Sequence, residues 1–541
     1  MPTDEGAGRL ALVGGRVRTL DNHDSVVEAI AIDRGRIVAL GSEADVMAAL
    51  PDAAQVVRLD GRTVLPGLID AHTHLELSAL AEHWWLDIRG LTPGAALERV
   101  AAAIATRPPG AWLVGQGTFG QDLPSRAELD RVAPDTPVVL RQSMHLLVAN
   151  SAALGLAGID RHYAAPRGMR VARDALGEPS GIVREGFDLF PIPAAPEDEL
   201  RAQLREQTRA LFVRRGVTTI QELPASARGI RAWQRLLADG QLPCRITLNP
   251  ILSPGHQPTV ASVEEFLEVD LGPGADVEGG WLKLGALKLF LDGGDLDTGF
   301  SRGVLAASPR RWGILNFTYE ELAAILADCR RHGVQVWMHA IGDAAQEMAL
   351  DAVEDVNVAF GASDHRTRIE HIGNYLSDWS QLDRMRAAGI VPVPNAVFLH
   401  QEPDDLDARL GPGERAYAYR SMIAAELSTP GNSDTAGARP ASANPWFAIR
   451  AMVTRRNAGG ATISRDEAVD VRTALATYTS HGAHAAFEER LKGTLEPGKL
   501  GDLAVYADDP LTLDPAALAD LEADLTVVGG VVVHHTAAQR R

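Results

Sequence analysis

Short apolar runs separated by glycine turns fill the beginning of the chain. Four of them lie at residues 10–13, 16–20, 29–32 and 37–41. Runs of this length between turn signals predict β-strands. The segments 501–506 and 525–533 have the same pattern. We therefore expect one small β-sandwich domain built from residues 1–64 together with residues 485–541, the alternative being two unrelated edge ribbons.

The pattern changes between residues 65 and 484, where apolar strand-like runs alternate with helical stretches. Such alternation predicts an α/β domain with a parallel sheet and crossover helices. Eight strand candidates lie at residues 63–70, 216–222, 244–252, 282–291, 334–339, 367–371, 390–397 and 427–432. Eight parallel strands match a (β/α)8 TIM barrel. The interval after barrel strand 1 is too long for one crossover, so an insertion is expected at about residues 80–200.

Composition and charge narrow the range of functions. The chain has 541 residues, of which 46% are hydrophobic and 23% charged, as in ordinary globular proteins. A net charge of −19 argues against binding to nucleic acid or to an anionic membrane surface. Cys244 and Cys329 follow no metal-binding spacing, and two cysteines argue against a disulfide framework. Without an apolar signal core or a membrane-spanning segment, we expect a cytoplasmic protein.

Residues able to bind a metal ion follow the predicted barrel strands. In an extended strand, side chains two positions apart point to the same face, so His72 and His74 converge after the apolar run 65–69. Barrels carry their chemistry at the carboxyl ends of the strands. The later predicted strands bring further candidates to that end, namely Lys288, His339, His371 and Asp434. Each of these residues, taken alone, has an ordinary structural explanation. Because all of them lie at the same end of one predicted barrel, we favour a cation that several of them bind together.

Lys288 lies within the apolar run 284–290. A buried lysine is costly and requires a partner. One explanation is a salt bridge to Asp292 or Asp434. The other is that carbon dioxide carboxylates the amine, which then becomes an anionic ligand able to bridge two cations.

Five segments carry a recognisable pattern, namely residues 66–74, 339–343, 369–371, 431–434 and 495–504. In these segments the chain resembles the amidohydrolase superfamily. Within it, the chain is similar to the amidohydrolase-3, YtcJ-like family, which includes N-substituted formamide deformylases. The resemblance covers nearly the whole chain. One departure is that residues 435–439 separate Asp434 from Pro440, where the family often has a proline within two residues.

The resemblance implies a hydrolase with two divalent metal ions. The implied ligands are His72, His74 and Asp434 for one ion, His339 and His371 for the second, and carboxylated Lys288 between them together with a hydroxide. Nitrogen and oxygen ligands without thiolate suit zinc, with manganese or iron as alternatives. Asp434 would accept the proton of the hydroxide and return it to the leaving amine.

Other polar residues have candidate roles around this site. His145 lies in segment 142–154, which resembles a histidine-containing segment of the family, and would donate a hydrogen bond to the substrate carbonyl oxygen. The alternative is that it caps or packs the following helix, which Asn150 or Ser151 would start. Glu222 and Asp343 would either orient a ligand histidine or pair with an arginine.

Aromatic residues occur in the segments expected to cover the site, namely Trp84, Trp85, Phe119, Phe187, Phe190, Phe300 and Trp312. They would suit a small-molecule substrate with a bulky apolar substituent. Packing within a lid is the alternative. Trp312 is the member that we place against the substrate.

We therefore expect a metal-dependent amidohydrolase that cleaves a non-peptide C–N bond in an amide, N-formyl amine or carbamate. A deaminase is less well matched, because residues 340–343 after His339 lack the glutamate of those relatives. An ester or lactone hydrolase shares the same chemistry. The alternative outside the enzymes is a catalytically silent binding or regulatory protein. Such a protein would not need the full set of candidate metal ligands, which argues against it. A homodimer is the default assembly.

Overall fold

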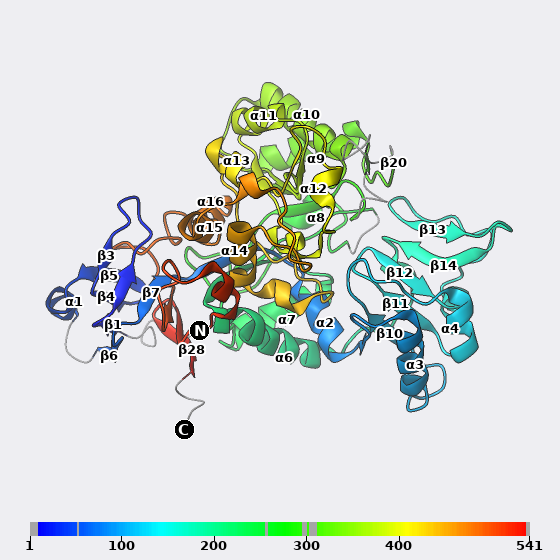
Figure 1. The fold of residues 1–541 in the computed structure, drawn as a ribbon, viewed down its shortest axis with the longest axis horizontal. Coiled ribbons are helices and arrows are strands. Elements are labelled where there is room, and N and C mark those ends of the chain that lie inside the picture. The colour runs from blue at the N-terminus through cyan, green and yellow to red at the C-terminus, as the bar shows by residue number, and fades with distance from the viewer. Residues whose placement is uncertain (1–8, 51–53, 255–257, 295–299, 302–310, 537–541) are drawn as a thin grey trace.

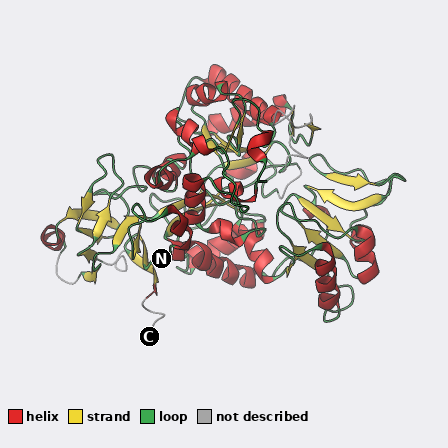
Figure 2. Ribbon diagram, viewed as in Figure 1, coloured by secondary structure: helices red, strands yellow, loops and turns green. Residues whose placement is uncertain are grey.

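The computed structural model describes residues 9–50, 54–254, 258–294, 300–301 and 311–536. A β lobe lies at one end of the molecule, a central α/β part in the middle, and a second β-rich lobe at the opposite end (Figure 1). Most helices surround the central part, as Figure 2 shows. Within the described ranges, no helix combines the length and the apolar character that a membrane crossing requires.

Both ends of the chain build the first β lobe. Its elements are β1 (Leu10–Val13), β2 (Arg16–Arg18), β3 (Val26–Val27), β4 (Ala29–Asp33), β5 (Arg36–Gly41), α1 (Glu43–Ala49), β6 (Gln55–Arg58), β7 (Thr63–Pro66), β26 (Leu503–Tyr506), β27 (Leu525–Val528) and β28 (Val531–His535). They form one sheet of order β5-β4-β1-β6 and another of order β28-β27-β26-β7-β2-β3. Because β7 pairs in parallel with β2 and antiparallel with β26, the two ends share one sheet.

A hydrophobic cluster joins the two sheets of this lobe. It contains Leu12 and Ile32 from the first sheet and Val64 and Leu503 from the second, all buried. Burial of such side chains away from water is the main favourable contribution to folding. The domain limits 1–64 and 485–541 stay predictions.

A buried ion pair connects the β lobe to the central part. Nε and Nη2 of Arg245 donate to the two carboxylate oxygens of Asp502 at 2.7 and 2.9 Å. The backbone N–H of Gly529 also donates to Asp502. Burial raises the pKa of the Asp502 carboxyl, but the neighbouring Arg245 outweighs it and holds that pKa below its usual value. An exposed pair, Arg36 and Glu278, spans the same junction at 4.0 Å.

The central part contains two parallel four-stranded sheets. The first consists of β8 (Leu68–Thr73), β15 (Val217–Glu222), β16 (Arg245–Leu248) and β17 (Leu282–Leu284), and the second of β18 (Leu287–Phe290), β21 (Val336–His339), β22 (Arg368–Glu370) and β24 (Val391–Val393). An isolated parallel bridge between Ile251 and Lys288 links them. Seven of these strands fall within six of the eight predicted runs, and β8 overlaps the first run, 63–70, but continues to Thr73. The fourth run is interrupted at Gly285, where an added Cβ would lie 2.2 Å from Oδ1 of Asn249.

The eighth predicted strand, residues 427–432, is wrong as a regular strand, because the structure assigns no strand to this segment. Its backbone nevertheless lies beside β8. Ala71 donates to the carbonyl of Gly431, and Asp434 donates to the carbonyl of His72. Pro430 has no N–H to donate to a ladder, which accounts for the irregular path.

Helices surround the central sheets (Figure 1). The longer ones are α2 (Leu75–His83), α6 (Glu197–Gln207), α7 (Ala227–Ala238), α9 (Tyr319–His332), α10 (Asp343–Phe360), α11 (Ser380–Ala388) and α14 (Pro445–Thr454), and shorter ones are α8 (Val263–Leu267), α12 (Leu406–Arg409), α13 (Tyr419–Ala424), α15 (Val471–Thr477) and α16 (Ser480–Ala485). Local signals set their limits. Thr318 and Glu321 form a capping box at the start of α9, and Gly333 ends it in the left-handed conformation.

The second lobe lies within the region where an insertion is expected. It contains β9 (Leu86–Asp87), α3 (Pro93–Ile104), β10 (Leu113–Gln116), α4 (Arg126–Val132), β11 (Val138–Arg141), β12 (Leu146–Ala149), α5 (Ser151–Leu156), β13 (Arg170–Arg173) and β14 (Pro179–Arg184). Its six strands form one sheet of order β13-β14-β12-β11-β10-β9. Figure 1 shows this lobe projecting away from the first β lobe. It carries His145 on the segment that precedes β12.

Candidate functional site

His72, His74 and Asp434 converge at the carboxyl end of β8. The two Nε2 atoms of His72 and His74 lie 3.3 Å apart, and each is 3.5 Å from Oδ1 of Asp434. One ligand atom from each of the three side chains lies within 4.8 Å of the others. Asp434 has a positive φ of 44°, a strained conformation that the pairing with β8 holds in place. These three residues therefore fit around one cation.

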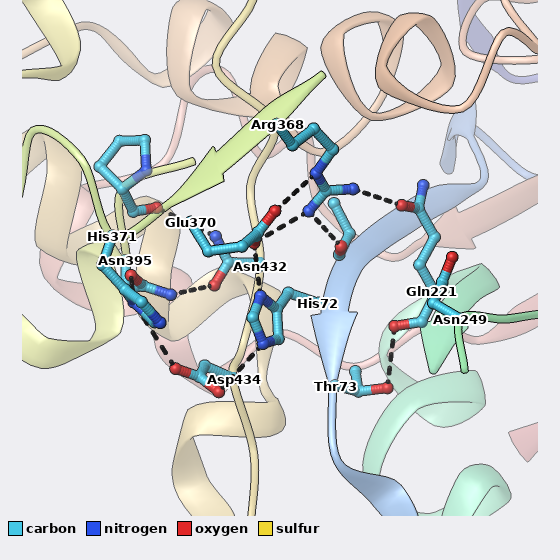
Figure 3. A network of polar contacts seen from close by, with 12 residues as sticks. His72, Thr73, Gln221, Asn249, Arg368, Glu370, His371, Asn395, Asn432 and Asp434 are labelled. Carbon is cyan, nitrogen blue, oxygen red and sulfur yellow. Dashed lines mark hydrogen bonds and ion pairs between the residues drawn. The ribbon is translucent and has the colours of Figure 1, made fainter. Parts of the chain in front are cut away.

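A buried ion pair orients His72 from behind (Figure 3). Nδ1 of His72 lies 2.5 Å from Oε2 of Glu370, whose other oxygen accepts from Nε of Arg368 at 2.8 Å. Burial raises the pKa of Glu370, but Arg368 and His72 outweigh it and hold that pKa far below its usual value. An ionised Glu370 keeps the proton of His72 on Nδ1 and leaves the Nε2 lone pair facing Asp434. The sequence alone did not reveal this role.

His371 and His339 form the second group of candidate ligands. Their ring centroids lie 4.5 Å apart. Nδ1 of His371 lies 2.6 Å from Oδ1 of Asn395, an orienting partner that the sequence did not reveal. Burial lowers the pKa of His371 to about 4 and that of His339 well below its usual value, so both rings are neutral and able to bind a metal ion. Nε2 of His339 lies 3.3 Å from the carbonyl of Gly293.

Lys288 is fully buried, and its Nζ has no hydrogen-bond partner among the described residues. Of the two explanations for Lys288, a salt bridge to Asp292 or Asp434 is wrong, because no such pair occurs among the described residues. Asp292 instead accepts from the backbone N–H groups of Ile341 and Gly342 and lies 3.7 Å from Nε2 of His339. Burial lowers the pKa of the Lys288 amine to about 8, although Glu370 and Asp434 oppose the shift.

The donor set fits a divalent cation. It consists of imidazole nitrogens and carboxylate oxygens without thiolate, which suits zinc, manganese or iron. The unpartnered Nζ of Lys288 is a buried polar atom whose cost of burial requires compensation.

His145 contacts Glu185 instead of capping a helix. Its Nδ1 lies 2.9 Å from Oε2 of Glu185, and its ring is 5.9 Å from that of His339. Asn150 caps α5, so the capping alternative for His145 is wrong. Gly294 lies against the imidazole, because an added Cβ would be 2.1 Å from the His145 ring. Glu185 is a further residue that the sequence analysis missed.

Three further residues predicted to lie around the site are Glu222, Asp343 and Trp312. Glu222 accepts from Thr73, Leu75 and Glu76 at the start of α2, so within the described residues it holds neither a histidine nor an arginine. Burial raises the pKa of the Glu222 carboxyl to about 8. Asp343 is the first residue of α10. Trp312 belongs to the short strand β20 (Arg311–Trp312), and its side chain lies outside the part that the structure describes.

A cavity of about 330 Å³ opens onto the candidate site. Polar residues that line it are Ser143, His145, His339, His371, Asn374, Gln401, Glu402, Asp434, Arg439 and Ser442, and aromatic ones are Phe119, Tyr375, Phe398 and Tyr417. Of the expected aromatic cover, Phe119 lines this cavity. Trp85, Phe187 and Phe190 line a separate cavity, and the rings of Trp85 and Phe187 both pack against the guanidinium of Arg141. The Phe300 side chain lies outside the described part.

Comparison with known proteins gives one consistent result. A family model described as the amidohydrolase family matches residues 55–534. The N-substituted formamide deformylase of Arthrobacter pascens is 28% identical and aligns over 97% of this chain and 98% of its own length. The amidohydrolase YtcJ of Bacillus subtilis is 27% identical over 96% of this chain and 98% of its own. The fold is similar to that of a metal-dependent hydrolase from Pyrococcus horikoshii, with a TM-score of 0.72, 22% identity and coverage of 94% and 99%.

Proposed function

Since this chain belongs to the amidohydrolase family, we propose that it is a metal-dependent hydrolase of a non-peptide C–N bond. The observation that carries the proposal is the convergence of His72, His74 and Asp434 within 4.8 Å. We interpret the two parallel sheets and segment 427–434 as one closed (β/α)8 barrel, whose strands deliver these residues to one end. We also propose that the protein is cytoplasmic and forms a homodimer.

The proposed site holds two divalent ions, with zinc the best match to the ligands. His72, His74 and Asp434 would hold one ion, and His339 and His371 the other, with carboxylated Lys288 between them. When bound, such ions polarise a substrate carbonyl and lower the pKa of water. The Lys288 pKa of about 8 leaves part of the amine neutral near pH 7, and the neutral form is the one that reacts with carbon dioxide.

Asp434 and His145 would act on the substrate itself. Asp434 lines the cavity beside His72, where its carboxylate can accept a proton from the attacking water and deliver it to the leaving amine. His145 can donate from Nε2 to the carbonyl oxygen as negative charge develops there. The carboxylate of Glu185 beside Nδ1 would stabilise the doubly protonated ring that this donation requires.

An amide, N-formyl amine or carbamate is the proposed substrate class. The name of the formamide deformylase relative supports an N-formyl amine, and the aromatic side chains in the cavity suit an apolar substituent.

Metal analysis combined with a substrate panel tests this function. Purified protein supplemented with zinc or manganese and bicarbonate should contain about two metal ions per chain and release amine from N-formyl amines. Absence of bound metal after supplementation would refute the proposal. Hydrolysis of esters but not of any amide or carbamate would overturn the C–N bond assignment.

A further inference from the structure

Arg439 is a cationic side chain that lines the cavity, and one of its nitrogen atoms lacks a hydrogen-bond partner among the described residues. Its Nη1 is buried and has no hydrogen-bond partner among the described residues. No other described residue that lines the cavity has a buried polar atom in this state. Burial lowers the pKa of the Arg439 guanidinium, yet an arginine stays charged at neutral pH. Arg439 is half-buried and lines the cavity, so an anion that enters the cavity gains from contact with its positive charge.

The backbone that carries Arg439 is fixed on both sides. Gly437 has a φ of +86°, and an added Cβ would lie 2.4 Å from Cβ of Ala81, so the loop packs directly on α2. After the loop, the hydroxyl and the backbone N–H of Ser442 donate to the carbonyl of Arg439 at 2.8 and 3.0 Å. A fixed position is what a specific contact to a ligand requires. This is the loop in which the sequence departs from the family pattern.

Two carboxylates also line the cavity, of which Asp434 belongs to the candidate metal site and Glu402 is already hydrogen-bonded. Glu402 accepts hydrogen bonds from the hydroxyls of Tyr375, at 2.8 Å, and Tyr417. Burial also raises the pKa of Glu402, which weakens its attraction for a cation. Arg439 is the one lysine or arginine among the described residues that line the cavity. The cavity therefore favours an anionic ligand group over a cationic one.

We propose that Arg439 binds a carboxylate of the substrate, so that the preferred substrates are amides carrying a carboxylate near the scissile C–N bond. The inference rests on the proposed function and narrows its substrate class. A guanidinium pairs with a carboxylate through two parallel hydrogen bonds. A phosphate offers similar oxygens, but its second negative charge would lack a partner on this wall.

A matched pair of compounds tests the proposal. N-formylphenylalanine and N-formylphenethylamine differ by the carboxylate alone. In the metal-loaded wild type, we expect kcat/KM to favour the carboxylate compound by about 10- to 100-fold, the range of a charge-assisted hydrogen bond. Arg439→Met should remove this preference while retaining hydrolysis of N-formylphenethylamine. Arg439→Lys should retain part of it.

Arg450→Met is the control variant. Burial lowers the pKa of His400, and Arg439 and Arg450 both add to this shift, so the two arginines lie in the same electrostatic surroundings. Arg450, however, packs on Phe447 and does not line the cavity. We expect this variant to keep the wild-type preference. Equal kcat/KM for the two compounds in the wild type, or a preference that survives in Arg439→Met, would overturn the proposal. A stronger preference for the phosphonate analogue would overturn the assignment to a carboxylate.

Failure of the proposed function gives a different result. If the protein hydrolyses neither compound, both become inert ligands, and calorimetry measures their binding to the metal-supplemented protein. Tighter binding of N-formylphenylalanine that is lost in Arg439→Met would support the role of Arg439 although the activity is absent. Binding that is the same in both proteins would refute it.

Discussion

Lys288 has the least favourable surroundings of the residues at the site. Its charged form gains no hydrogen bond and loses its hydration, so the side chain reduces the stability of the metal-free protein. Lys288→Met should therefore leave the free energy of unfolding of the metal-free protein unchanged or raised. The same variant should lose bound metal and amide hydrolysis together. Elemental analysis and urea unfolding measure these effects, and wild-type metal content with full activity would show that Lys288 is structural.

Glu370 is the second residue for which the geometry gives a sharp expectation. Glu370→Gln removes the charge that holds the His72 tautomer and leaves Arg368 without its ion-pair partner. Loss of such an orienting group lowers metal affinity by about 10- to 100-fold. Competition with a chelator measures this affinity. Glu347→Gln is a matched control, because Glu347 pairs with Arg384 at a partly exposed position outside the cavity and should keep wild-type affinity.

At the scale of single residues, the sequence indicated the side chains with distinctive chemistry but not the residues that orient them. His72, His74 and Asp434 were predictable because they follow predicted barrel strands together with other candidate ligands, and this common position outweighs the ordinary explanation of each residue alone. Glu370 and Asn395 contact His72 and His371, but no pattern in the sequence assigned them this role, although Glu370 lies within the recognised segment 369–371. Their roles depend on which strands become neighbours, and this is a property of the folded chain.

Among the elements, the turn after β18 positions His145. The close approach of Gly294 to the imidazole means that Gly294→Ala must displace the ring. Removal of one donor to a developing oxyanion lowers kcat by about 100- to 1000-fold, so we expect a loss of kcat near the lower end of this range with metal content unchanged. Steady-state kinetics tests this. In Gly155→Ala the added Cβ meets nothing within 4 Å, so activity should stay at the wild-type level.

Apolar runs predicted most of the central strands, because burial on both faces gives parallel strands a continuous hydrophobic sequence. The fourth and eighth runs show where this reasoning fails. Gly285 admits the Asn249 side chain and splits β17 from β18, and Pro430 prevents a regular ladder. The first effect arises from a contact with another element, and the second from a single proline. Hydrophobic periodicity gives information about neither.

For the molecule as a whole, the buried pair between Arg245 and Asp502 holds the β lobe against the central sheets. Asp502→Asn leaves a buried guanidinium without a counter-charge, which lowers the free energy of unfolding by about 3–5 kcal/mol. Because the folded pKa of Asp502 is lowered, its contribution is present above the unfolded pKa and is lost as the pH falls through the folded value. Denaturant unfolding measures the loss. In the exposed pair across the same junction, Glu278→Gln should change stability by less than about 1 kcal/mol.

The arrangement of lobes was partly predictable at this scale. Matching strand patterns at both ends indicated a common β structure, and the long interval after the first strand indicated an insertion. The single six-stranded sheet of that insertion was not predicted, because the pairing of β9 to β14 depends on long-range contacts.

The shared sheet of the β lobe has a consequence for the order in which the protein is made. Strand β7 is synthesised early, but its partner β26 leaves the ribosome only after more than four hundred further residues have been added. Until then β7 has an unpaired edge, the kind of surface that promotes association between nascent chains. Completion of the sheet that contains β7 therefore waits until β26 has been made, and a chain that stops before Leu503 should retain an open edge and aggregate.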